Sequence, residues 1–158
     1  MLGFITDDRV FELITLTAMV GWLALFLSPI APRIINAFAG TVAVGLLAAV
    51  YATVLIALMV NGPEGMSAMD FASLDGVTAL FATKEAVLVG WAHFLAFDLF
   101  VGAWEARTAR REGIPFYFVL PCMALTFLAG PFGFLLFLVL RARFAIGRPP
   151  QPSWPAGD

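Results

Sequence analysis

The sequence is short of the residues on which most soluble enzyme chemistry depends. It has one cysteine, Cys122, and one histidine, His93, among 158 residues. A single cysteine excludes an intramolecular disulfide, and a single histidine excludes a metal site built from several histidines. The sequence also lacks a Ser-His-acid arrangement, a phosphate-binding Gly-Lys loop and a dinucleotide fingerprint. It therefore predicts neither a soluble cofactor nor a metal.

Charged residues are also scarce, at 13% of the chain against 61% hydrophobic residues. Soluble domains have about a quarter charged and about half apolar residues. The formal net charge is -2 and the longest basic run is the pair Arg110-Arg111, so we expect no nucleic-acid partner. The charges are bunched between long apolar stretches, which is typical of integral membrane proteins surrounded by membrane lipids.

Four apolar stretches are long enough to cross a membrane as helices. They are Val10 to Ser28, part of Ile34 to Pro63, Ala86 to Trp104, and Ile114 to Leu140. Prolines, glycines or charges end each one, with Gly113 as the C-cap of a charged extension of the third span. We therefore predict an all-α, polytopic membrane protein, a four-transmembrane-helix bundle with both termini on the same side.

Residues 1–145 are expected to form this single domain, and residues 146–158 a Pro-rich, disordered tail. The acidic connection at residues 64–85 has Leu74, Val77 and Phe81 at helical spacing, which favours a short helix at the membrane surface. With four spans, the basic residues are nearly balanced between the two sides: Arg9, Lys84, Arg141, Arg143 and Arg148 against Arg33, Arg107, Arg110 and Arg111. The positive-inside rule then selects no orientation.

One acid lies near the middle of the third predicted span. Asp98 is 12 residues beyond Ala86, about 18 Å along a helix. A charged aspartate at that depth costs on the order of 3 kcal/mol, so we expect it to face the bundle interior and to be paired or neutral. Trp91 and Glu105 are each seven residues from Asp98 and share its helix face.

Asp98, His93 and Glu105 are the candidate catalytic residues. His93 lies about 140° around the helix from Asp98, so the two cannot act on one atom but could address two ends of an extended ligand. A neutral Asp98 could be a general acid while His93 or Glu105 accepts a proton elsewhere. The alternatives are that Asp98 joins helices through a hydrogen bond and that His93 is a packing residue.

Aromatic and small residues are the candidate ligand contacts. We expect a slot for a polyene or sterol-like ligand among the phenylalanines of the last two spans, Phe94, Phe97, Phe100, Phe127, Phe132, Phe134 and Phe137. The proposed lining residues are Trp91, Phe94, Phe97, Gly102, Phe127, Gly130 and Pro131. The alternative is that the phenylalanines only fill space between helices or face lipid. Gly45, Ala48, Ala49 and Ala52 indicate tight helix packing, and a homo-oligomer is an open alternative.

Two blocks of the sequence carry a family resemblance. GWAHFLAFDLFVGAWEA at residues 90–106 and TFLAGPFGFLLFLVLR at residues 126–141, with Gly113-Ile114-Pro115 and Pro121-Cys122 between them, resemble the neoxanthin-synthase-like family. That family includes plant abscisic-acid-deficient-four-like membrane proteins and bacterial members. The positions that match its pattern are His93, Asp98, Gly102, Gly130, Pro131 and Gly133.

The resemblance implies a small integral membrane protein linked to carotenoids. In plants, such proteins are needed for the isomerisation of violaxanthin to neoxanthin in plastid membranes, in which an epoxide opens and an allene forms. The N-terminus, MLGFITDDRVFE, has neither a basic leader nor a small-residue cleavage site. We therefore expect no removed transit peptide and a bacterial inner-membrane location.

Three functions follow from these features. The first is an intramembrane isomerase or modifying factor for a carotenoid or related isoprenoid. The second is a non-enzymatic pigment- or lipid-binding assembly factor, in which the aromatic residues bind and Asp98 transfers no proton. The third is a small proton-coupled transporter in which Asp98 and Glu105 form a relay.

Overall fold

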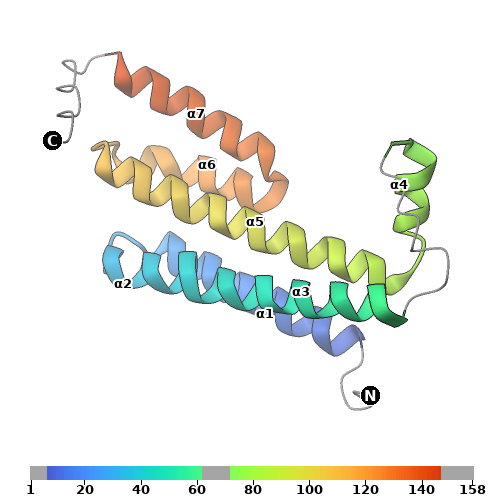
Figure 1. The fold of residues 1–158 in the computed structure, drawn as a ribbon. Helices are drawn as coiled ribbons and strands as arrows, with labels where there is room; N and C mark the ends of the chain where they lie inside the picture. Colours follow the sequence, from blue (N-terminus) through green and yellow to red (C-terminus); the bar gives the residue numbers. More distant parts are fainter. Residues whose placement is uncertain (1–6, 62–71, 147–158) are drawn as a thin grey trace, which may run out of the picture.

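The computed structural model describes residues 7–61 and 72–146, and these residues form helices without a strand (Figure 1). The elements are α1 (Asp7–Phe26), α2 (Pro32–Ala37), the π-helix η1 (Phe38–Ala43), α3 (Val44–Asn61), α4 (Leu74–Leu80), α5 (Lys84–Arg111), α6 (Phe116–Ala129) and α7 (Pro131–Ala145). Within these described residues, three segments are long and apolar enough to span a membrane: Asp7–Phe26, Pro32–Val60 and Lys84–Arg111. The all-α prediction is confirmed, and the apolar helices fit a membrane protein.

Helix α5 is the centre of the bundle. It packs against α1, α3, α6 and α7. In its apolar 18-residue stretch 56% of the residues are buried, against 28% in the corresponding stretch of α1. The helix begins where the side chain of Thr83, its N-cap, accepts a hydrogen bond from the Ala86 backbone at 3.3 Å. It ends before Gly113, whose φ of +64° favours glycine. The C-cap is Glu112, so Gly113 lies one position beyond the cap at which the sequence placed it.

The second predicted span is one continuous helical segment with a change of winding. The backbone stays helical from α2 through η1 into α3, because the residues that join them, Phe38 and Val44, both have right-handed helical angles. The small-residue stripe predicted to pack helices points outward instead. A side chain at Gly45 would meet nothing within 4 Å, and Ala48, Ala49 and Ala52 are exposed.

The predicted short helix in the acidic connection is α4. The side chain of Ser73 caps its first turn by accepting a hydrogen bond from the Gly76 backbone at 3.0 Å. Figure 1 shows α4 set apart from the main bundle, beside the ends of α3 and α5. Phe81 follows α4 and its ring lies against Gly90 of α5. This contact anchors the connection to the bundle.

The fourth predicted span is two helices rather than one. Helix α6 stops at Ala129, Gly130 takes a φ of +32°, and Pro131 begins α7. The two helices run antiparallel: the rings of Phe118 and Phe144, at the open end of the hairpin, have centroids 5.6 Å apart. With 14 and 15 residues, each helix is about 21 to 23 Å long, short of the roughly 30 Å hydrocarbon core.

The hairpin changes the predicted placement of the two ends. Arg141 of α7 forms a salt bridge with Glu112, just after α5 (2.6 Å), whereas the ring of Phe11 in α1 stacks on Trp91, near the start of α5, at 6.0 Å. The described chain therefore begins with α1 at one end of the bundle and finishes with α7 at the other, as Figure 1 shows. This arrangement of the described helices differs from the predicted bundle with both termini on the same side, because a half-length hairpin returns to its starting end. The predicted tail lies outside the described residues, except for Ile146, which follows α7.

Candidate functional site

Asp98 lies in the middle of α5 and is 8% exposed. Its carboxyl group faces the break between α6 and α7: a side-chain carbon on Gly130 would lie 2.6 Å from Asp98 Oδ1. Asp98 Oδ2 is buried and has no hydrogen-bond partner among the described residues. Pro131 has no N–H to donate to the carbonyl of Phe127, so the end of α6 presents backbone acceptors in this region. The carboxyl group thus sits beside an opened stretch of backbone.

Glu105 lies two helical turns beyond Asp98 on α5 and is fully buried. Its Oε1 accepts a hydrogen bond from Thr126 Oγ1 of α6 at 2.9 Å, while Oε2 is buried without a partner among the described residues. The predicted common face of Asp98 and Glu105 is therefore the face that the hairpin covers. The seven-residue separation corresponds to about 10.5 Å along the helix axis. The two carboxyl groups therefore lie about two helical turns apart on one buried face of α5.

Gly102 lies between the two acids and is covered by a side chain that the sequence reasoning missed. The indole of Trp22 in α1 occupies the space where a side chain on Gly102 would be. Trp22 is 2% exposed, and its ring meets Phe127 edge to face at 5.5 Å. The expectation that Gly102 admits another backbone or a flat ligand is therefore corrected, because the indole fills that space. The signal was a tryptophan among the small and aliphatic residues of the first span.

We expect Gly102→Ala to destabilise the protein by about 1 to 3 kcal/mol, because the added methyl group must displace a buried indole. The double variant Gly102→Ala with Trp22→Phe removes the six-membered part of that indole. Its loss of stability should be smaller than the sum of the two single losses, with a coupling of about 1 kcal/mol. Thermal unfolding of the four proteins in one detergent measures this coupling, and strictly additive losses would contradict the contact.

His93 points away from the acids, as the helical wheel predicted. It is exposed, and its ring stacks on Phe97 at 4.6 Å and lies 5.6 Å from Tyr51 of α3. The same side chain lines a groove of about 370 Å³ between α3, α4 and α5. Most of the groove wall is aliphatic or aromatic, including Leu55 and Phe81. The structure therefore places His93 in a lateral apolar groove, separate from Asp98 and Glu105.

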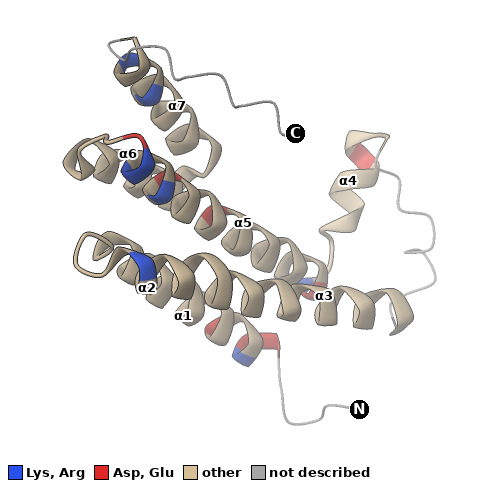
Figure 2. Ribbon diagram, turned by 60° about the vertical axis from the view of Figure 1, so that its left-hand side comes forward, with Lys and Arg blue, Asp and Glu red and all other residues tan. Residues whose placement is uncertain are grey.

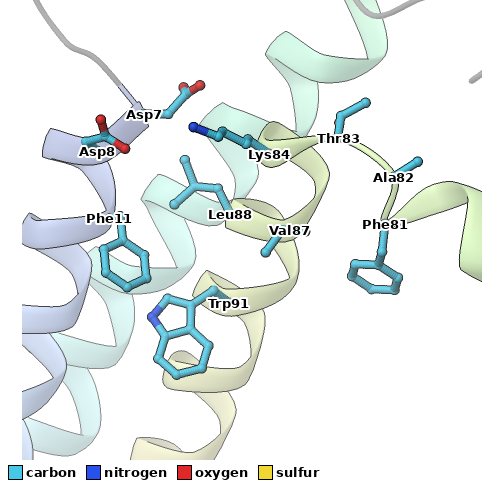
Figure 3. A pocket seen from close by; sticks show the side chains of 10 residues that line it. All are labelled: Asp7, Asp8, Phe11, Phe81, Ala82, Thr83, Lys84, Val87, Leu88 and Trp91. Atoms are coloured by element: carbon cyan, nitrogen blue, oxygen red, sulfur yellow. The ribbon is translucent and has the colours of Figure 1, made fainter.

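By its sequence spacing Trp91 shares a helix face with Asp98 and Glu105, but it lies at the far end of the bundle from Glu105. Its indole nitrogen donates to Thr15 Oγ1 at 3.2 Å, and Phe94 stacks on it at 5.5 Å. Trp91 also lines a hollow of about 460 Å³ between α1 and the start of α5. Figure 3 shows Lys84 reaching toward the N-terminal end of α1 above this hollow. Trp91 and Phe94 are thus grouped with each other and not with Asp98.

The phenylalanines of the last two predicted spans do not form the single slot that was expected. Phe97, Phe100 and Phe132 are between 46% and 61% exposed. Phe134 and Phe137 instead pack edge to face on Trp104, at 5.6 and 5.5 Å. Of the predicted ligand contacts, Gly102, Phe127 and Gly130 lie around the two acids, and Pro131 is exposed. Most of these rings therefore fill the hairpin interface or face outward.

Metal-binding side chains are not clustered within residues 7–61 and 72–146: no three His, Cys, Asp or Glu residues there could hold one ion.

Comparison with known protein families gives a match: the family described as ABA DEFICIENT 4-like matches residues 9–137. No curated protein matches the chain. No solved structure matches it either. The matched range includes α5, the whole of α6 and the turn at Gly130, and therefore both buried acids and the helix break.

Proposed function

Because the chain belongs to the ABA4-like family, we propose that it is an integral membrane protein that acts on a carotenoid or a related isoprenoid by proton transfer inside the bundle. The observation that carries this proposal is the pair of buried carboxyl groups, Asp98 and Glu105. Each has an oxygen with no partner among the described residues. A buried polar group without a partner costs roughly 1 to 3 kcal/mol, so structure alone gives little reason to keep two of them.

The proposed chemistry is an isomerisation, and it needs a donor and an acceptor of protons. When an epoxide opens to an alcohol and an allene, the oxygen gains a proton, one C–O bond breaks and a neighbouring carbon loses a proton. The electron pair of the broken C–H bond forms the new double bond, so no oxidant or reductant is required. A neutral Asp98 is the proposed acid and Glu105 the proposed base. The pair then holds one proton before and after the reaction.

The test is pigment conversion in a carotenoid-producing bacterial membrane. Expression of the protein should produce a new isomer in the total extract, with the same mass as its precursor and a changed absorption spectrum. Chromatography with mass spectrometry distinguishes an isomer from an oxidised product. An unchanged extract across several carotenoid backgrounds would count against isomerisation.

The lateral groove favours a second candidate, a non-enzymatic factor that binds a pigment or lipid. Tyr51, Phe81 and His93 line it together with aliphatic side chains, which suits one end of an apolar chain. In that case pigment should co-purify unaltered. Tyr51→Ala should reduce the amount bound, whereas Asp98→Asn should not. An unchanged amount of bound pigment in Tyr51→Ala would exclude the groove as the binding site.

A further inference from the structure

Most basic residues of the described chain lie at one end of the bundle, and Arg9 and Lys84 lie at the other. Figure 2 shows Lys and Arg at α2, at the C-terminal end of α5 and on α7. Between α2, η1 and α5 this end contains a hollow of about 520 Å³. We call it the arginine pocket. Four arginines line it, Arg33, Arg107, Arg110 and Arg111, together with Asn36 and Thr41.

The charged residues that line the arginine pocket are all of one sign. Its lining holds four guanidinium groups and no carboxylate. Glu112, the acid next in sequence, does not line the pocket; it accepts hydrogen bonds from Arg141 Nε at 2.8 and 3.0 Å. Arg107 and Arg111 lie one turn apart on α5, where like charges repel. A bound anion would relieve that repulsion.

Two side chains of the pocket are held in place before any ligand binds. Arg107 lies against η1 where Gly40 has no side chain, so closely that a methyl group there would clash with its guanidinium. Asn36 is 9% exposed and its Nδ2 donates to the Pro32 carbonyl at 2.8 Å. Its Oδ1 is buried and has no partner among the described residues. A fixed acceptor beside four cationic donors suits an anionic ligand that also carries a hydroxyl or ammonium donor.

The position of the pocket along the candidate membrane spans indicates which kind of ligand it binds. The pocket lies where two candidate spans end, at Pro32 and at Arg111, which is the level of lipid headgroups when these spans cross a membrane. Arginine binds phosphate oxygens through paired N–H groups, and basic pockets between transmembrane helices bind anionic headgroups. We propose that the arginine pocket binds a phosphate ester bearing a hydroxyl or ammonium group, supplied by a lipid headgroup or by a soluble phosphate. This proposal does not depend on the proposed isomerisation.

The test measures phosphate-dependent binding by the full chain, delipidated in a neutral detergent. Native mass spectrometry and thermal unfolding are recorded with phosphatidylglycerol, with phosphatidylcholine and with inorganic phosphate. We expect phosphatidylglycerol to bind at least tenfold more tightly than phosphatidylcholine. Stabilisation by phosphatidylglycerol alone assigns the headgroup as the source, whereas equal stabilisation by inorganic phosphate assigns a soluble one. No preference among the three would overturn the proposal.

Variants distinguish binding in the arginine pocket from nonspecific attraction to the other basic side chains at that end of the bundle. Arg33→Gln changes an exposed side chain and should not affect folding, yet it should weaken phosphatidylglycerol binding about tenfold, since it removes one charged donor from the pocket. The combined variant Arg107→Gln with Arg111→Gln should abolish the preference. Arg143→Gln removes an exposed charge of α7 outside the pocket and should leave binding unchanged. An equal loss in Arg143→Gln and Arg33→Gln would show nonspecific attraction and refute the site.

Discussion

Asp98→Asn is expected to abolish formation of the new carotenoid isomer while the protein still folds. The amide has nearly the shape of the carboxyl group and still fits beside Gly130, so the packing of α5 on the hairpin is kept. It cannot, however, release a proton to an epoxide oxygen. General acid–base catalysis contributes typically 10² to 10⁴-fold, so the residual conversion should fall below about one hundredth of the wild-type rate. Chromatography of total pigment at equal protein levels measures it.

Glu85→Gln is the matched control, because it removes an exposed carboxylate from the first turn of the same helix. Its conversion should equal that of the wild type. Infrared spectroscopy adds an independent readout: the wild type should show a protonated carboxyl band at neutral pH that is missing in Asp98→Asn. Full turnover in Asp98→Asn would remove this residue from the mechanism and favour the binding role of the lateral groove.

Gly133→Ala is expected to give the largest loss of stability of the substitutions considered. Gly133 lies in the first turn of α7, and an added methyl group would overlap the backbone nitrogen of Thr126 in α6. Side chains can rotate away from a small intrusion, but backbone atoms of a packed helix cannot. The two helices must therefore separate, which costs at the upper end of overpacking, about 3 kcal/mol or more. A melting temperature lower by roughly 6 to 12 °C follows.

The matched control is Gly45→Ala, which adds the same methyl group to a helical glycine where it meets nothing within 4 Å. Alanine favours helix over glycine by about 1 kcal/mol, so this variant should be as stable as the wild type or slightly more stable. Thermal unfolding in one detergent compares the two. Equal stability of both variants would disprove the close crossing of α6 and α7. Gly133→Ala should also weaken the hydrogen bond between Thr126 and Glu105, since both depend on the position of α6.

The sequence predicted the features that depend on one helix at a time. Helical spacing was enough to place Asp98 and Glu105 on one buried face and His93 on another. Gly113 marked the C-terminal end of the extended third span, close to the observed end of α5 at Arg111. These predictions succeeded because they rest on local geometry, which does not change with the neighbouring helix.

The sequence did not predict the features that arise between helices. Hydropathy treats Ile114 to Leu140 as one long apolar stretch, and Pro131 alone predicts only a kink. The reversal needs Gly130, which adopts a positive φ directly before the proline, and Gly133, which lets the two backbones meet. Trp22 over Gly102 was missed for a related reason, since no pattern within one helix shows which side chain of another helix fills a small gap.

The reversal at Gly130 also decides how an insertion machinery would orient the chain. With four spans the arginines and lysines were balanced between the two sides. With the hairpin, Arg141 and Arg143 return to the end that holds Arg33, Arg107, Arg110 and Arg111, leaving Arg9 and Lys84 at the other end among the described residues. The positive-inside rule then favours this arginine-rich end on the cytoplasmic side. The arginine pocket would there face the more anionic leaflet, so one glycine would set both topology and lipid contact.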